Sequence, residues 1–336
     1  MKTLITGGSG YIGSHMAVKL IEEGHEVVLF DNLSNSFLNS IDAIKEITKY
    51  KPLFIKGDIK STVNLDDLFS KNSFDNVIHF AAYKAIGESV KYPLKYYENN
   101  ILGSINLLKA MQKYGVKDLV FSSSASVYGE ADKIPITEEC IKNPTNPYGK
   151  SKLAFEEILE DIVTSENIFN VASLRYFNPI GAHETGILGE SPVVPYNIMP
   201  VIADVLMGRK KSLEIFGNDY PTDDGTCVRD YLHVQDLVEG HLAALSYIKE
   251  NKGISTFNLG TGVGTSVMEL IRKFEEITYK KIDIEFSPRR MGDVPVLYTC
   301  PNKALKVLNW KTKRSLNDMC EDTWRWLKNN PNGFNF

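Results

Sequence analysis

The sequence has few of the features that mark membrane, nucleic-acid-binding or secreted proteins. Its longest basic cluster is Arg209-Lys210-Lys211, and the net charge is −4 with a pI near 5.9. That charge balance gives no reason to expect nucleic-acid or membrane binding. No window of about 18 apolar residues is present, so we expect no membrane-spanning helix. A short apolar run at the start leads straight into a glycine-rich turn, and we expect no signal peptide.

Cysteine is also scarce. The four cysteines, Cys140, Cys227, Cys300 and Cys320, are widely separated and form no CxxC motif. This pattern argues against a zinc site and a disulfide framework, and it predicts a reducing compartment, the cytoplasm. The six histidines stand singly, as structural histidines do, and we predict no metal.

Short apolar segments alternate with amphipathic ones in the first half of the chain. We predict strands at 2–6, 26–30, 53–55, 76–80, 118–122 and 171–176, with helices at 11–23, 64–71, about 94–114 and 151–164. Parallel strands need crossover connections, which are usually helices. The alternation therefore predicts an α/β fold with a Rossmann-type, doubly wound parallel sheet.

The character of the chain changes after about Phe177. Proline and glycine become dense at 179–200 and 217–225, and shorter helices are expected at 201–207, 236–249, 267–278 and 316–327. We therefore predict two domains. The first, at 1–176, is a dinucleotide-binding Rossmann domain that residues 231–249 rejoin. The second, at 177–336, is a smaller mixed α/β domain that binds the substrate.

A glycine-rich turn follows the first predicted strand. Gly7, Gly10 and Gly13 give the pattern G-x-x-G-x-x-G, which lets the backbone approach a pyrophosphate at the start of a helix. Asp31 ends the second predicted strand, where a carboxylate accepts hydrogen bonds from an adenosine ribose. Each feature alone is weak, since Asp31 could simply open a turn. Together they predict a dinucleotide site, and a carboxylate that repels a 2′-phosphate favours NAD over NADP.

Tyr148 and Lys152 lie four residues apart, on one face of a helix that Pro147 is expected to begin. An ammonium beside a phenol, together with a positive nicotinamide ring, favours tyrosinate and hence general-base chemistry. With 16 tyrosines in the chain the spacing also arises by chance, so its position matters more. The run Ser122-Ser123-Ser124 closes the preceding strand at the sheet edge where cofactor chemistry takes place, and Ser124 could hydrogen-bond the reacting oxygen.

Taken together, these motifs resemble the extended short-chain dehydrogenase/reductase family, and within it the UDP-glucose 4-epimerases (UDP-galactose 4-epimerases), over essentially the whole chain. The many matching motifs occur in the same order, which makes a chance similarity negligible. The matching stretches are Thr6–His15, Asp31–Ser36, Gly57–Ile59, Val77–Ala82, Lys84–Val90, Ser122–Gly129, Pro147–Lys152, Leu174–Ala182, Ile215–Thr226, Val228–Val234, Asn258–Gly264 and Pro288–Asp293.

The resemblance implies a set of site residues, with Ser124, Tyr148 and Lys152 at the catalytic positions. The cofactor contacts that it implies are Gly7, Gly10, Tyr11, Ile12, Gly13, Asp31, Asn32, Asn35, Ser36, Asp58, Ile59, Phe80, Ala81, Ala82, Lys84, Asn99, Ser124, Tyr148, Lys152 and Phe177. The substrate contacts that it implies are Ser124, Tyr148, Asn178, Asn197, Arg229, Tyr231, Arg290, Asp293 and Leu297. The two arginines also suit a diphosphate by their own chemistry, because guanidinium groups clamp phosphates.

The activity implied by the resemblance is reversible 4-epimerisation of UDP-glucose and UDP-galactose through a 4-keto intermediate. Tyr148, as tyrosinate, would take the C4 hydroxyl proton while hydride passes to NAD. The keto sugar would then rotate, and hydride would return to its opposite face. NAD is regenerated in each turnover and stays tightly bound. The family also implies a homodimer, formed through helices near 94–114 and 151–164.

Leu297 departs from the family pattern and leaves an alternative open. In the family a tyrosine at this position restricts the pocket to glucose and galactose, while a small residue admits N-acetyl sugars. Leucine is intermediate, so a dual-specificity or UDP-N-acetylglucosamine 4-epimerase stays possible. A nucleotide-sugar 4,6-dehydratase shares the Tyr/Lys pair, but here Ser124 is followed by Ala125-Ser126 instead of an Asp-Glu pair. A non-catalytic dinucleotide sensor would have no need of Tyr148, Lys152 or the two arginines.

Overall fold

Seven parallel strands form the main sheet of the computed structural model, which describes residues 1–166, 168–194, 197–290 and 292–334. Their order across the sheet is β11-β6-β5-β4-β1-β2-β3, with every neighbouring pair parallel. The strands are β1 (Lys2–Thr6), β2 (Glu26–Asp31), β3 (Leu53–Lys56), β4 (Asn76–His79), β5 (Asp118–Ser122), β6 (Asn170–Tyr176) and β11 (Gly253–Leu259). The strand order reverses between β1 and β4, which is where such sheets bind dinucleotides.

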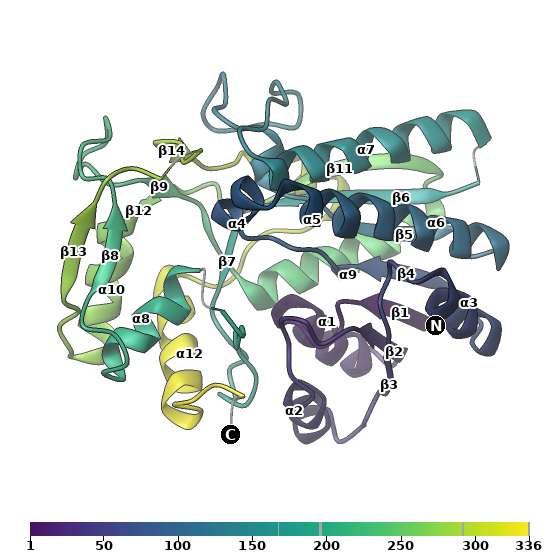
Figure 1. Ribbon diagram of the computed structural model, residues 1–336, viewed down its shortest axis with the longest axis horizontal. Helices are drawn as coiled ribbons and strands as arrows, with labels where there is room; N and C mark the ends of the chain where they lie inside the picture. Colours follow the sequence, from purple (N-terminus) through teal and green to yellow (C-terminus); the bar gives the residue numbers. More distant parts are fainter. Residues whose placement is uncertain (167, 195–196, 291, 335–336) are drawn as a thin grey trace.

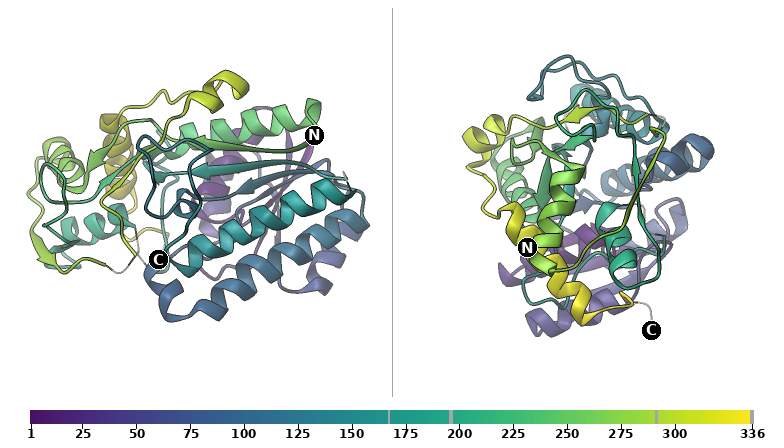
Figure 2. Two further views of the ribbon diagram at one scale, coloured as in Figure 1. Left: turned by 90° about the horizontal axis from the view of Figure 1, so that it is seen from above. Right: turned by 90° about the vertical axis from the view of Figure 1, so that its left-hand side faces the viewer.

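Helices cover both faces of this sheet (Figures 1 and 2). Successive strand residues point to opposite faces, so Leu4 packs into one apolar core and Ile5 into the other. The core of Ile5 contains residues of α1 (Tyr11–Glu22), α2 (Asn39–Thr48) and α9 (Val234–Glu250). The core of Leu4 contains residues of α3 (Thr62–Lys71), α6 (Gly103–Lys113) and α7 (Pro147–Glu166). The predicted Rossmann-type, doubly wound sheet is confirmed.

The expected strands and helices mostly agree with the observed elements to within a few residues. The helix expected at 94–114 is instead three consecutive segments: α5 (Pro93–Tyr97), the π-helical η1 (Glu98–Leu102) and α6. The sequence does not predict α2, α4 (Ile86–Lys91) or β11. Strand β11 lies at the edge of the sheet, and four of its seven residues are only partly buried. It therefore lacks the continuous apolar run that marks a strand covered on both faces.

A smaller part of the molecule lies beyond the carboxyl ends of the main strands (left in Figure 1). Its strands pair as β7 (Asn178–Ile180) with β10 (Tyr231–His233), β8 (Leu213–Phe216) with β13 (Ile284–Ser287), and β9 (Val228–Arg229) with both β12 (Thr265–Ser266) and β14 (Val296–Leu297). Its helices are α8 (Ile198–Leu206), α10 (Val267–Thr278) and α12 (Leu316–Asn329), and α11 (Asn302–Leu308) packs against β11 and α9.

The chain returns to the main sheet after entering the smaller part. Helix α9 packs against α1, β5 and β6, and β11 joins the sheet beside β6. The sequence suggests a return only at 231–249, whereas the structure also brings back 253–259. The domain boundaries at 176 and 177 stay a prediction. Among the described helices, none combines the length and the hydropathy needed to cross a bilayer.

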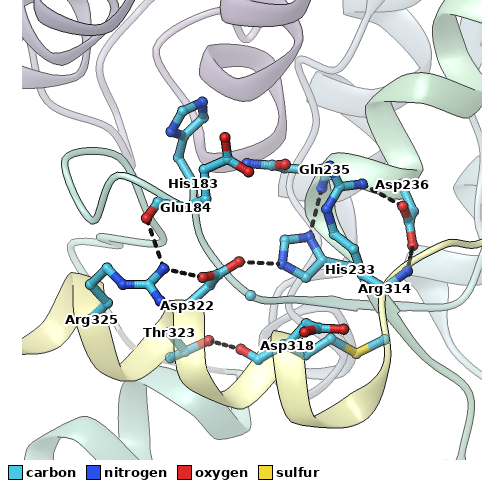
Figure 3. Close-up of polar contacts among 12 residues, drawn as sticks. His183, Glu184, His233, Gln235, Asp236, Arg314, Asp318, Asp322, Thr323 and Arg325 are labelled. Atoms are coloured by element: carbon cyan, nitrogen blue, oxygen red, sulfur yellow. Dashed lines mark hydrogen bonds and ion pairs between the residues drawn. The ribbon is translucent and has the colours of Figure 1, made fainter.

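A polar network fastens α12 to β10 and α9 (Figure 3). His233 Nε2 lies 3.2 Å from Asp322 Oδ2, and Arg325 pairs with the other oxygen of the same carboxylate. Arg314 Nη1 donates to Asp236 Oδ1 at 2.5 Å. His233 and Asp236 are fully buried, and buried charged groups are stable only with such partners. The network thereby holds β10, and with it the paired strand β7 that begins at Asn178.

Candidate active site

A cavity of about 460 Å³ lies between the carboxyl ends of the main strands and the smaller part. This size is typical of small-molecule sites. Of the residues expected in the cofactor and substrate sites, its lining contains Gly7, Gly10, Tyr11, Ile12, Gly13, Asp31, Asn32, Asn35, Ser36, Ile59, Phe80, Ala81, Ala82, Lys84, Asn99, Ser124, Tyr148, Lys152, Phe177, Asn178, Asn197, Arg229, Asp293 and Leu297. Three expected residues, Asp58, Tyr231 and Arg290, lie outside the described lining.

The glycines between β1 and the start of α1 lie where a side chain would meet nearby atoms. Gly7 has φ +71°, and a Cβ atom there would lie 2.7 Å from the backbone nitrogen of Ala81. A Cβ atom on Gly13 would lie 2.2 Å from the carbonyl oxygen of Gly7. Helix α1 begins beside this turn with no side-chain cap on Gly10 and no acidic residue in its first turn. The positive end of the helix is therefore available to a pyrophosphate.

Asp31 ends β2 at the same edge of the cavity. Its carboxylate accepts hydrogen bonds from the backbone nitrogens of Ser9 (3.1 Å) and Leu33 (2.8 Å) and from Ser36 Oγ (3.0 Å). Burial raises the pKa of the Asp31 carboxyl, and these hydrogen bonds oppose the rise. A carboxylate has about four acceptor positions, so three internal bonds leave capacity for a ribose hydroxyl.

The rest of the expected adenosine side surrounds Asp31. Asn32 Nδ2 donates to Asp58 Oδ2 at 3.1 Å. Asp58 does not line the cavity itself, but it holds the side chain of Asn32, which does. Ile59 is buried beside them. Asn35 Oδ1 accepts from the backbone nitrogen of Val193 at 3.1 Å, which brings a distant segment to this end of the cavity.

The chain after β4 and the η1 segment form the opposite wall. Phe80 packs its ring against His241, with ring centroids 4.8 Å apart. Lys84 Nζ pairs with Glu190 Oε1 at 3.2 Å. Asn99 lies in η1, and its Nδ2 donates to Asn100 Oδ1 at 3.0 Å. The π-helical turn breaks the regular helix at this wall, and such turns are frequent at functional sites.

Tyr148 and Lys152 lie on the first two turns of α7. The helix begins at Pro147, as predicted, and Asn146 Oδ1 accepts from the backbone nitrogen of Gly149 at 2.9 Å. Tyr148, Lys152 and Ser124 are all buried. The Ser124 side chain hydrogen-bonds the Tyr148 phenol, and Lys152 Nζ donates to the carbonyl of Ser122 at 2.7 Å. The structure thus brings the three expected catalytic residues to one place.

Burial dominates the electrostatics of this group. It raises the pKa of the Tyr148 phenol, and the hydrogen bond with Ser124 opposes the rise. It also lowers the pKa of Lys152 to about 7, while the nearby Glu156 carboxylate opposes the fall. The sequence predicts that Lys152, together with a positive nicotinamide ring, favours tyrosinate, and this stays a prediction. In the structure Lys152 Nζ donates to the Ser122 carbonyl, and burial has the largest effect on the pKa of the Tyr148 phenol.

A buried ion pair that no sequence pattern predicts lies behind the catalytic residues. Glu156 follows Lys152 by one helical turn, and Arg175 Nη2 donates to its Oε2 at 2.6 Å. Ser123 Oγ, next to Ser124 in the chain, donates to Glu156 Oε1 at 2.5 Å. Both charged side chains are almost completely buried. The pair therefore joins α7 to β6 and to the strand end that carries Ser124.

The expected substrate residues come mainly from β9, β14 and the loop before β14. Strands β9 and β14 pair so that Arg229 lies opposite Leu297. Arg229 Nη1 donates to the carbonyl of Val294 at 2.8 Å, and Nη2 lies 3.8 Å from Asp293 Oδ1. Leu297 packs against the apolar cluster that contains Phe177. Arg229 is therefore held rigidly at the cavity wall, with a carboxylate nearby to orient it.

Two expected substrate residues have other partners. The Arg290 guanidinium lies 3.6 Å from the centre of the Phe216 ring, a cation–π contact that keeps it outside the lining. Tyr231 is buried in β10, and burial raises its pKa. Neither residue faces the cavity among the described contacts, so their substrate roles stay predictions.

The lining also contains residues that sequence reasoning missed. The sequence does contain a feature that could have identified Asn146, since asparagine before a proline is a common start of a helix. Glu190 has no such feature, because it lies in a proline- and glycine-rich segment with no periodicity. It reaches the cavity only through the path of the chain between β7 and α8.

Comparisons with known proteins agree with this geometry. A family model described as GDP-mannose 4,6 dehydratase matches residues 4–323. A UDP-glucose 4-epimerase of Bacillus subtilis (strain 168) is 49% identical over 335 residues, covering 99% of each chain. The solved UDP-glucose 4-epimerase of Bifidobacterium longum in complex with NAD+ and UDP has a TM-score of 0.97 and 42% identity, and the match covers 99% of this chain and 100% of that one. The UDP-glucose-4-epimerase of Stenotrophomonas maltophila, with bound NAD and formylated UDP-arabinopyranose, has a TM-score of 0.94 and 46% identity, and the match covers 98% of each chain.

The full-length relatives show to which branch of the broad family the chain belongs. The family model carries the name of a dehydratase, whereas the full-length relatives at 42–49% identity carry the name of an epimerase. Identity of this level extends over almost the entire chain and is accompanied by the same fold. The chain belongs to the UDP-glucose 4-epimerase family, a branch of the extended short-chain dehydrogenases/reductases.

Proposed function

We propose that this protein is an enzyme that catalyses the reversible 4-epimerisation of UDP-glucose and UDP-galactose with tightly bound NAD. The observation that carries the proposal is the single cavity that joins the glycine turn and Asp31 at one end to Ser124, Tyr148 and Lys152 in the middle and Arg229 at the other. A dinucleotide end, a general base and a diphosphate-binding arginine in one cavity are the parts that this reaction requires.

The residues at the cofactor end fit NAD. A side chain at Gly7 or Gly13 would clash with nearby backbone, and the first turn of α1 carries no competing acid. Asp31 retains acceptor capacity and brings a negative charge, which suits a ribose hydroxyl and opposes a 2′-phosphate. The glycine turn and Asp31 would hold NAD, which would supply a hydride acceptor and donor for C4 of the sugar and would not be consumed.

The chain's own residues supply the proton chemistry. Tyr148 is the base that removes the proton from the C4 hydroxyl and later returns it. Ser124 hydrogen-bonds the phenol and can donate to the sugar oxygen. Lys152 places its amino group one turn from Tyr148 in a buried site, where the charge of its ammonium form acts strongly. Arg229 holds the diphosphate, so the sugar can turn over while the nucleotide stays fixed.

Removing the phenol tests the proposal. Tyr148→Phe is expected to lower turnover of UDP-galactose by about 10²–10⁴-fold, the usual contribution of a positioned general base, with NAD content unchanged. Tyr279→Phe serves as the matched control, because Tyr279 is 95% exposed at the end of α10. The assay uses purified protein with no added NAD and identifies the product sugar. Wild-type turnover in Tyr148→Phe would refute the role of Tyr148.

The same product assay separates the alternatives. A 4,6-dehydratase would release a 4-keto-6-deoxy sugar instead of UDP-glucose, and a non-catalytic sensor would release nothing. Acceptance of N-acetyl sugars stays a prediction. It depends on the room beside Leu297, which lines the cavity, and is tested by parallel assays on UDP-galactose and UDP-N-acetylgalactosamine.

We also propose a homodimer formed through the helices near 94–114 and 151–164. Large apolar side chains are exposed at the start of this region, with Leu94 74% exposed and Leu102 49% exposed. Exposed apolar residues grouped in this way often mark an interface. Light scattering of the purified protein measures its mass directly. A cytoplasmic location is supported by the free thiols of all four cysteines, and cell fractionation tests it.

A further inference from the structure

Glu190 joins the two sides of the cavity. Its side chain is 9% exposed. Its Oε1 accepts hydrogen bonds from Lys84 Nζ at 3.2 Å and from Asn197 Nδ2 at 2.5 Å. Lys84 follows β4, on the cofactor side, whereas Asn197 precedes α8 in the smaller part. One carboxylate therefore holds two side chains that the resemblance assigns to ligand binding.

The orientation of Asn197 is unusual for its position. Asn197 is the N-cap residue of α8, where an asparagine side chain normally accepts a hydrogen bond from an amide of the first helical turn. Its side chain makes no such bond. The amide instead points at Glu190, on the cavity wall. Because the Asn197 side chain does not cap its helix, we infer that its orientation has a function in the cavity.

Glu190 determines which polar atoms of Asn197 and Lys84 stay available to a ligand. An asparagine amide has a donor end and an acceptor end of nearly the same shape. A carboxylate only accepts, so it holds Nδ2 of Asn197 and leaves Oδ1 to accept from another group. A lysine ammonium has three donors, and Glu190 engages one of them. The cavity is thereby offered an acceptor from Asn197 on the substrate side, which suits a sugar hydroxyl, and donors from Lys84 on the cofactor side.

The charge of Glu190 makes a purely incidental role hard to explain. A carboxylate at the wall of a cavity for phosphorylated ligands opposes their binding. Lys84 offsets that charge directly. The segment is also tied a second time, where the backbone nitrogen of Val193 donates to Asn35 Oδ1 at 3.1 Å. Two ties three residues apart hold Glu190 in place over the cavity.

We propose that Glu190 is a positioning residue for the sugar of the nucleotide-sugar substrate. It directs the acceptor end of the Asn197 amide toward a sugar hydroxyl, joins that side chain to Lys84 on the cofactor side, and does not itself take part in proton transfer. The proposal rests on the epimerase function proposed above. Recognition of the UDP part depends on Arg229 and its surroundings, and is independent of Glu190.

The test compares binding of the sugar with binding of the nucleotide alone. Glu190→Ala is expected to lower kcat/KM for UDP-galactose by about 10–100-fold, the effect of losing one or two oriented hydrogen bonds. The loss appears as a higher KM with kcat little changed. The affinity of the NAD-loaded protein for UDP, measured by calorimetry, is expected to change by less than about twofold. Glu184→Gln is the matched control, because Glu184 lies on the same segment and is exposed.

The conservative variant shows whether position or charge matters. Glu190→Gln is nearly isosteric, keeps one acceptor oxygen for Asn197, and is expected to recover part of the loss in KM. It also carries the test if Glu190→Ala does not fold. Equal weakening of UDP and UDP-galactose binding, or unchanged kinetics in both variants, would overturn the proposal. If the wild-type protein fails to epimerise UDP-galactose, the proposed function itself is wrong, which keeps the two failures apart.

Discussion

Replacing Glu156 by glutamine tests the buried ion pair behind the catalytic residues. The side chains of Glu156 and Arg175 are 1% and 3% exposed. Two guanidinium nitrogens donate to the carboxylate at 2.6–3.2 Å, and Ser123 and Ser173 donate at 2.5 and 3.1 Å. Removing the negative charge leaves the Arg175 cation buried without a counter-ion.

The expected loss of stability follows from that burial. Removing one partner of a buried pair costs about 3–5 kcal/mol. For 336 residues, an unfolding entropy of about 2.1 cal/mol/K per residue sums to roughly 0.7 kcal/mol/K. The melting temperature should therefore fall by about 4–7 °C. An exposed pair gives the control: Lys113 and Asp66 are 60% and 52% exposed, so Asp66→Asn should lower the melting temperature by less than about 1 °C.

Thermal unfolding followed by circular dichroism measures both variants under identical conditions. The double variant Glu156→Gln/Arg175→Met removes both charges and is expected to recover most of the stability, because an uncharged pair needs no counter-ion. A melting temperature of Glu156→Gln within about 1 °C of wild type would refute the reasoning. So would a double variant less stable than Glu156→Gln alone.

Two further predictions concern Lys152 and Leu297. Burial lowers the pKa of Lys152 to about 7, below the value of about 10.4 in an unfolded chain. Between these two pH values the unfolded state binds more protons than the folded state. The Lys152 side chain therefore makes the free energy of unfolding rise with pH from about 7 toward 10. Urea unfolding should show wild type gaining about 2 kcal/mol over Lys152→Met between pH 7 and 8.5, and no relative gain would contradict the lowered pKa. Leu297→Ala enlarges the cavity beside Phe177 and should raise kcat/KM for UDP-N-acetylgalactosamine relative to UDP-galactose by about tenfold, while Leu297→Tyr should lower it. An unchanged ratio in both variants would show that Leu297 does not bound the sugar site.

Local patterns were sufficient to predict the fold and a few residues of the cavity lining, whereas the family resemblance supplied most of the others. Gly7, Asp31 and Ser124 each end or follow a predicted strand, and parallel strands bring their carboxyl ends to one edge of a sheet. Tyr148 could be placed because Pro147 marks the start of its helix. Topology alone therefore predicted that these residues meet, and the structure places them around one cavity.

Contacts between distant segments were decided by the tertiary structure. Lys84 and Glu190 are 106 residues apart, and no spacing in the sequence announces their meeting. Arg290 matches a family motif, yet its guanidinium stacks on Phe216. The pKa of Tyr148 also depends on burial, which sequence alone does not give. Periodicity and turn residues reflect short-range geometry, so the sequence by itself determined the sheet and the edge at which the active site lies. The polar network across the cavity depends on how the two folded parts pack together. Only the tertiary structure shows that network.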